Sequence, residues 1–212
     1  MIPVQVLAVR YLANASPALC QALGAPEGYP ALGLLTTDCD DATYIALDAA
    51  TKASEVEVAY GRSFYAGASN ASTPNAGEVI GILAAQTPGA VRSGMEAALS
   101  ELKRVGFEQV HKVPYLAHTV SSAGTFLSGE AGVAPGSALA YLIAPPLEGM
   151  YAMDAALKAA DVTLCKLYAP PSETNFGGGL LSGTQSACDA ACAAFAAAVA
   201  EAAERPVEHG QY

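Results

Sequence analysis

The chain has 212 residues, of which 52% are hydrophobic and 14% charged, a composition too apolar for a disordered chain. Its formal charge is −10 at pH 7 and its sequence contains no run of Lys or Arg, which argues against binding to nucleic acid or to an anionic membrane. A small cation is a more natural partner, and the scarcity of charged surface predicts large contacts between subunits.

The amino terminus carries no basic leader, and its apolar run is broken too early for a signal peptide. The longest other apolar run, ALAYLIAPPL from Ala138, is short and ends in two prolines. We therefore expect that no segment spans a bilayer. The expected location is the cytoplasm.

One segment of the chain is present twice. DAATKASEVEV from Asp48 returns as DAALKAADVTL from Asp154, with six of eleven residues unchanged. Two more pairs follow the same order, namely QVLAVRYLA from Gln5 with QVHKVPYLA from Gln109, and ALGLL from Ala31 with ALAYL from Ala138. One register throughout predicts two homologous domains, residues 1–107 and 108–212.

The first half alternates between strand and helix patterns. Residues 4–8 alternate as a strand does, and residues 31–37 form a short apolar run of strand length. Asp40 and Asp41 are placed to cap a helix that follows at once. After it, VEVAYGRSFYAG predicts two short strands or a strand and a bend.

A second helix is predicted over PGAVRSGMEAALSEL, and the Ala-rich segment 187–203 is its counterpart in the second half. Each half then has a few strands and two main helices. The predicted fold class is α/β, as an α+β sandwich in each of two tandem domains.

Two polar, glycine-containing segments, AGASNASTPNAG from Ala66 and NFGGGLLSG from Asn175, are predicted to be equivalent loops that can move. Ordinary surface connections are the alternative.

The five cysteines are interpreted as thiols. Cys188 and Cys192 form a helical stripe with Phe195 and Val199, which favours core packing over a metal site.

Catalysis is not indicated by any motif. The three histidines, at positions 111, 118 and 209, do not stand at metal-ligand spacing, and the sequence has no nucleophile elbow, phosphate-binding loop or dinucleotide glycine pattern. We expect no enzyme, no metal and no cofactor.

Several long segments together resemble a known family, among them LGLLTTDCDDATYIALDAATKA, AYLIAPPLEGMYAMDAALKAADV and LLSGTQSACDAAC. The sequence is similar to EutL-type shell proteins of ethanolamine-utilisation bacterial microcompartments over nearly its whole length. The resemblance implies tandem, circularly permuted BMC domains. Three chains would form a pseudohexameric homotrimer that tiles edge to edge with other shell proteins, in the shell of a cytoplasmic organelle.

The resemblance also implies site residues. Asp40, Asp41 and Glu78 match acidic residues of a small pore within each subunit, where a protonated amine such as ethanolamine binds, and Phe107 matches a residue near that site. A gate on the threefold axis would include Gly67, Asn70, Phe176, Gly177, Gly178 and Gly179.

Lys52 and Lys158 match tile-edge lysines, and each can form an exposed i, i+4 salt bridge, with Asp48 and Asp154. Where the family has an arginine and a threonine, Ser122 and Ala123 stand here, which leaves the ligand preference open. An alternative function is a soluble binding protein or sensor for a small cationic amine that never tiles.

Overall fold

The computed structural model describes residues 1–64 and 77–207. The chain divides into two compact units. The N unit contains Pro3–Gly106 together with Ala123–Glu130, and the C unit contains Met1–Ile2, Phe107–Ser122 and the chain from Ala131 onward. The break after Gly106 lies beside the predicted domain boundary, while residues 123–130 of the second half belong to the N unit.

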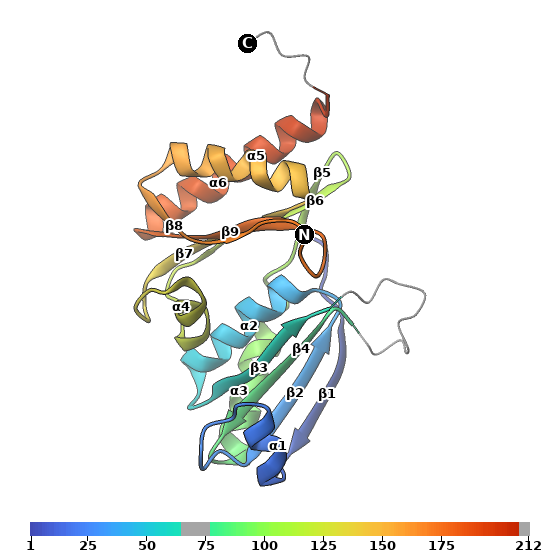
Figure 1. Cartoon of the computed structure of the whole chain (residues 1–212), viewed down its shortest axis with the longest axis vertical. Coiled ribbons are helices and arrows are strands. Elements are labelled where there is room, and N and C mark those ends of the chain that lie inside the picture. Colours follow the sequence, from blue (N-terminus) through green and yellow to red (C-terminus); the bar gives the residue numbers. More distant parts are fainter. Residues whose placement is uncertain (65–76, 208–212) are drawn as a thin grey trace. The chain divides into compact units, whose positions relative to one another are not determined.

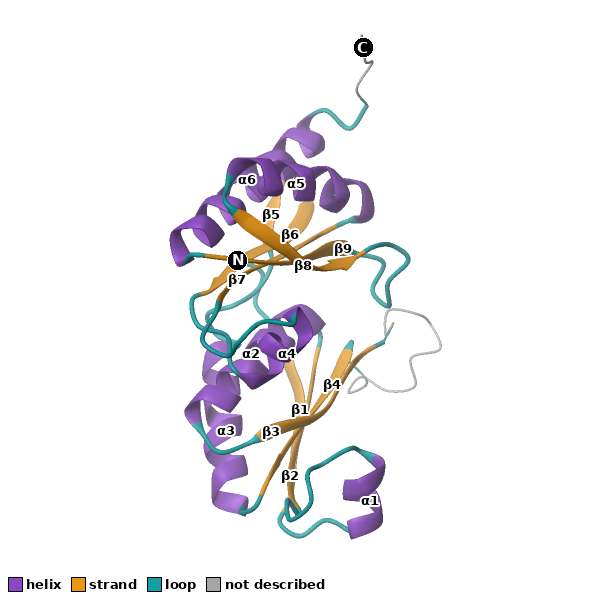
Figure 2. Ribbon diagram, turned by 60° about the vertical axis from the view of Figure 1, so that its left-hand side comes forward, coloured by secondary structure: helices purple, strands orange, loops and turns teal. Residues whose placement is uncertain are grey.

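The N unit is a four-stranded antiparallel sheet with helices on both faces (Figures 1 and 2). Helices α2 and α3 cover one face and α1 lies on the other (Figure 2). The strand order is β1-β2-β4-β3. The elements are β1 (Val6–Leu12), α1 (Pro17–Ala22), β2 (Ala31–Thr37), α2 (Asp40–Ala53), β3 (Glu57–Ser63), β4 (Val79–Ala85), α3 (Pro88–Glu101) and α4 (Thr125–Ala131).

The C unit is a five-stranded antiparallel sheet whose one face is covered by α5 and α6 (Figure 1). The strand order is β5-β6-β7-β9-β8. The elements are β5 (Glu108–Val110), β6 (Val113–Val120), β7 (Ala138–Ala144), α5 (Pro146–Ala159), β8 (Val162–Tyr168), β9 (Gly177–Gly183) and α6 (Gln185–Glu204).

Both units confirm the predicted α+β class, and the helices predicted over residues 88–102 and 187–203 are α3 and α6. The segment VEVAYGRS forms one strand, β3, rather than two. Helix α6 is long and apolar enough by length and composition to cross a membrane. Its stripe of Cys188, Cys192, Phe195 and Val199 is instead buried in the core of the C unit, as core packing of these residues predicts.

The two halves share one strand order, since β1-β2-β4-β3 corresponds to β6-β7-β9-β8. Even the irregularity between Val58 and Tyr60 in β3 has its counterpart between Leu164 and Lys166 in β8. The sequence pairing of the first strands, however, is wrong in register. Tyr11 lies opposite Gly33, and the equivalent of Gly33, Ala140, lies opposite Thr119.

The equivalent of Tyr11 is therefore Thr119, and not the Tyr115 that letter identity selects. Such a slip of four residues keeps every side chain on its own face of the sheet, so hydrophobic alternation cannot detect it.

Candidate functional site

Four carboxylates gather in the N unit at the end of β2 and the start of α2. This acidic cluster consists of Asp38, Asp40, Asp41 and Glu78. Glu78 directly precedes β4, and its backbone N–H donates to the Thr37 carbonyl at 2.8 Å, which brings it to the end of β2. The β2–β4 pairing thus joins residues that are distant in the sequence.

Asp40 and Asp41 are only 7% and 6% exposed. An oxygen of the Asp40 carboxylate accepts the backbone N–H of Asp41 at 2.9 Å, and Asp38 Oδ1 accepts the N–H of Gln5 at 2.7 Å. The amino-terminal end of α2 stabilises negative charge at this position, because its unpaired N–H groups carry partial positive charge. The predicted role of these aspartates as caps is only partly right, since Cys39 is the N-cap residue and both aspartates lie inside the first turn.

The carboxylates repel one another. Burial raises the pKa of Glu78 above its ordinary value, and the negative charges of Asp40 and Asp38 raise this pKa further. Burial, followed by the charge of Asp41, also raises the pKa of the Cys39 thiol. A cation bound at the cluster would remove this repulsion, so the geometry favours a positively charged ligand.

Phe107 and Phe176 lie together in the C unit, with ring centroids 5.6 Å apart. Phe107 is 9% exposed, and its carbonyl accepts the N–H of Ile2. The structure therefore brings together one residue predicted for the small pore and one predicted for the gate.

The predicted loop over Asn175–Gly183 is wrong from Gly177 onward, because Gly177–Gly183 form strand β9. A Cβ at Gly178 would lie 1.9 Å from the Leu142 carbonyl oxygen, and the φ of Gly178 is +155°. A Cβ at Gly179 would lie 2.2 Å from the Lys166 carbonyl oxygen. Close packing between strands explains these glycines, so a hinge is not needed to account for them. The other predicted gate residues, Gly67 and Asn70, lie outside the described residues.

The two Asp–Lys pairs differ. Asp154 and Lys158 form the predicted exposed salt bridge at 2.6 Å, with side chains 65% and 75% exposed. Lys52 lies 3.2 Å from Asp48, but the Asp48 side chain is fully buried, so the prediction of an exposed pair is wrong there.

Asp48 is buried because α4 covers it: its Oδ2 accepts the N–H of Gly124 at 2.8 Å and its Oδ1 that of Leu127 at 2.9 Å (Figure 2 shows α4 beside α2). Sequence reasoning missed this role and also missed Asp38. The acidic run DCDD was a signal that could have added Asp38 to the cluster, whereas nothing in the local sequence placed α4 over Asp48.

The sequence matches the BMC domain family over residues 31–116, a stretch that begins at β2 and continues past α3 into β6. It is 55% identical over 211 residues to the bacterial microcompartment shell protein EutL of Clostridium perfringens, covering 98% of this chain and 97% of that protein. It is 44% identical to the EutL of Escherichia coli, over 98% of this chain and 97% of that one.

The chain belongs to the EutL family of bacterial microcompartment shell proteins.

The structural comparison agrees with this assignment. The crystal structure of the EutL of Leptotrichia buccalis superposes with a TM-score of 0.95 at 54% identity and covers 98% of both chains. The trimeric shell protein PduB, 19% identical, shares the fold with a TM-score of 0.80 over 94% of this chain and 89% of that one. The BMC match takes its last strand from the second half of this chain, as expected where each EutL domain is circularly permuted.

Proposed function

We propose that this protein is a structural tile of a bacterial microcompartment shell that serves ethanolamine utilisation, located in the cytoplasm. The observation that carries the proposal is the near full-length identity with EutL shell proteins, together with a duplicated fold that superposes on theirs. A sensor that never tiles is not favoured, because the curated relatives are named as shell proteins.

The tile is proposed to be a homotrimer, in which three chains with two similar domains each occupy six positions and then meet other shell proteins edge to edge. The low charged fraction of 14% supports extensive contact between subunits. Lys158 is the proposed edge residue, because its side chain is 75% exposed. Lys52 stays a prediction for the same role.

The acidic cluster is the proposed site for a small protonated amine, ethanolamine in the first place. Two carboxylates that are almost fully buried and a third whose pKa is raised supply a negative potential that an ammonium group would neutralise. At about 4 Å one such pair gains roughly 4 kcal/mol near a protein surface. That Phe107 lies near this site, and that Gly67, Asn70 and Phe176–Gly179 gate a central pore, stay predictions from the resemblance.

Tiling is tested by negative-stain microscopy of concentrated protein at low salt. The wild type is expected to form flat hexagonal sheets, and Lys158→Ala to lose them while keeping its native mass. Lys103→Ala, a change of an exposed lysine outside both Asp–Lys pairs, is the matched control. A wild type that never forms sheets, alone or with other shell proteins of its organelle, would contradict the proposal.

A further inference from the structure

Inside the chain, α4 docks on α2 through a defined set of contacts, which we call the α2–α4 interface. The buried Asp48 carboxylate accepts two N–H groups at the start of α4, from Gly124 and Leu127. Thr51 Oγ1 accepts a third, from Thr125, at 3.2 Å.

An aromatic contact extends this interface: the ring of Phe126 lies 5.8 Å from that of Tyr44. It also approaches Gly61 of β3, where a Cβ would be 3.5 Å from Phe126 Cζ.

Helix α1 is the counterpart of α4 in the first half. Each follows the equivalent strand, β1 or β6, and each precedes the equivalent strand, β2 or β7. Their backbone hydrogen bonds match in two places. Cys20 N–H donates to Ser16 O (3.0 Å) as Ser128 N–H does to Gly124 O (3.2 Å), and Tyr29 N–H donates to Pro26 O (3.1 Å) as Ser137 N–H does to Ala134 O (3.1 Å). In addition, Gly24 and Gly132 both have a positive φ. Ser16 is therefore equivalent to Gly124, and Leu19 to Leu127.

Helix α5 is likewise the counterpart of α2. Both have 14 residues, and Asp154 with Lys158 repeats Asp48 with Lys52. The matching irregularities of β3 and β8 extend the equivalence to the neighbouring edge strand, where Leu167 stands for Gly61.

The two counterparts are exposed where the originals are buried. Leu127 is 1% exposed but Leu19 is 42% exposed. The Asp48 side chain is fully buried but that of Asp154 is 65% exposed. One side of the α2–α4 interface is thus repeated on α1 and the other on α5, and both Leu19 and Asp154 are exposed in the part of the chain that the structure describes.

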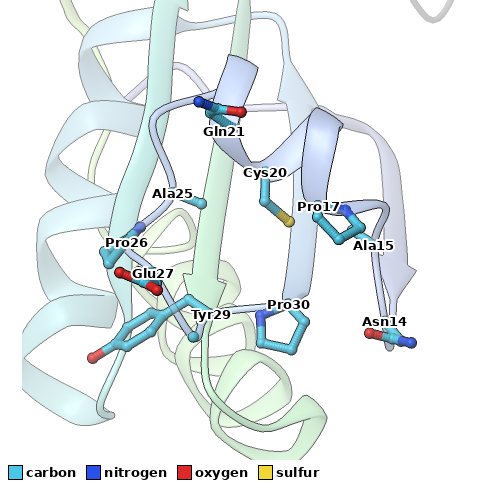
Figure 3. A pocket seen from close by; sticks show the side chains of 11 residues that line it. Asn14, Ala15, Pro17, Cys20, Gln21, Ala25, Pro26, Glu27, Tyr29 and Pro30 are labelled. Carbon is cyan, nitrogen blue, oxygen red and sulfur yellow. The ribbon is translucent and has the colours of Figure 1, made fainter.

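The inner side of α1 is already occupied by its own sheet. Ala15 and Cys20 pack against the cluster formed with Leu32 and Ile82. Beside them a pocket of about 550 Å³ lies between α1 and the loop to β2, with Pro17 and Cys20 on the helix side and Pro30 on the loop side (Figure 3). The outer side, with Leu19, is the one left for a partner.

Side chains that differ between the two sets differ in a compensating way. In the α2–α4 interface large Phe126 and Tyr44 face a glycine, Gly61. The residues equivalent to Phe126, Tyr44 and Gly61 are Ala18, Met150 and Leu167, respectively. The small Ala18 of the helix would therefore meet the large Leu167 of the strand, and Leu167 is 48% exposed.

The third hydrogen bond shows the same compensation. The donor Thr125 is replaced by Pro17, which has no N–H, and its acceptor Thr51 is replaced by Leu157, which has no acceptor group in its side chain. A donor and its acceptor are lost together, as in a real contact.

We propose that α1 of one copy of the chain docks on α5 and β8 of a second copy, with Asp154 accepting the backbone N–H groups of Ser16 and Leu19. The contact is head to tail, because each copy offers α1 to one neighbour and α5 to the other, and it closes into a ring. Ser16 has a Cβ where Gly124 has none, so α1 sits slightly further from α5 than α4 does from α2. This proposal rests on the proposed homotrimer and names the residues that hold it together.

The test is a disulfide between Ser16→Cys and Leu157→Cys. A Cβ built at Gly124 lies 2.2 Å from Thr51 Oγ1, so the equivalent pair across the proposed contact is within disulfide reach. Oxidation of the double variant is expected to give covalent trimers on a denaturing gel. Co-expression of the two single variants is expected to give dimers and no covalent trimers. Each single variant alone, and Ser16→Cys with the exposed Glu55→Cys, are the controls for background oxidation of native thiols.

The native mass of the wild type separates the possible failures. If the wild type is trimeric but the double variant forms no link between positions 16 and 157, or forms it inside one chain, this inference is overturned and the homotrimer stays intact. A monomeric wild type overturns the homotrimer itself.

A charge reversal gives a second test that needs no oxidation. Asp154→Lys removes the acceptor and places a cation against two N–H donors. The concentration for half-dissociation of the trimer is expected to rise roughly tenfold or more, since a hydrogen bond to a charged group is stronger than one between neutral groups. Asp189→Lys, an exposed aspartate on α6, is the matched control and should leave assembly unchanged. Equal effects of the two changes would contradict the proposal.

Discussion

The acidic cluster of the N unit and the equivalent place in the C unit have equivalent backbone positions but different side chains, carboxylates in the first and apolar groups in the second. The strand pairings make Glu78 equivalent to Phe176, since Val79 lies opposite Thr37 as Gly177 lies opposite Ala144. The helix equivalence places Pro146 and Leu147 where Asp40 and Asp41 stand.

In the C unit, Phe176 packs on the ring of Phe107, whereas its equivalent Glu78 lies among other carboxylates. Both halves thus share the fold, while the acidic side chains are present at this place in only one of them. We therefore expect one amine site per chain, and not two.

The glycine run of β9 is the sharpest structural difference between the halves, because β4 has Ile80 where β9 has Gly178. We expect Gly178→Ala to lower the free energy of unfolding by about 4 kcal/mol or more, since its Cβ would lie 1.9 Å from a carbonyl oxygen. Gly61→Ala, whose nearest neighbour would be 3.4 Å away, is the matched control. Urea unfolding measures both, and similar costs for the two would show that β9 can shift to admit a side chain.

The two equivalent aspartates should also differ. Asp48→Ala leaves two buried N–H groups without their acceptor, and a loss of about 3 kcal/mol in the free energy of unfolding is expected. Asp154→Ala should cost at most about 0.5 kcal/mol when measured on dilute, dissociated chains, because its salt bridge with Lys158 is exposed. Thermal unfolding of both variants decides the matter, and equal losses would refute the assignment of α4 to α2.

Glu78→Gln tests the cation site directly. Removal of one carboxylate from the acidic cluster is expected to weaken ethanolamine binding roughly tenfold or more, since a charged pair near the surface contributes several times RT. Calorimetry measures the affinity, and Glu55→Gln, an exposed carboxylate elsewhere, serves as the control. Unchanged affinity in Glu78→Gln would exclude Glu78 from the site.

The stability difference between the wild type and Glu78→Gln is expected to depend on pH. The pKa of Glu78 is raised in the folded chain, so the unfolded chain loses this proton first and ionisation destabilises the fold. Below the unfolded pKa near 4.5 the wild type should match Glu78→Gln in stability, and as the pH rises through the folded pKa the wild type should become the less stable of the two. Unfolding curves between pH 4 and pH 8 in the absence of amine test this, and a difference that does not change with pH would contradict it.

Much of the fold could be predicted from the sequence. The repeated Asp-x-x-x-Lys segment indicates helices α2 and α5, and the helical spacing of apolar residues indicates α3. The register of β1 and β6 depends instead on their pairing with β2 and β7. This pairing makes Thr119 the equivalent of Tyr11, whereas the matching sequence letters select Tyr115.

The site was predicted less completely. Asp40, Asp41 and Glu78 do come together, but the burial of Asp48 depends on a seven-residue helix far away in the sequence, which no local pattern places there. The glycines of β9 looked like a flexible loop because composition alone does not distinguish freedom of the backbone from close approach of a neighbouring strand.

Three copies of this duplicated chain are proposed to make one tile. Sedimentation equilibrium of the purified wild type decides whether they do. A single species with three times the chain mass of 21.4 kDa is expected. A species with the mass of one chain over the whole concentration range would contradict it.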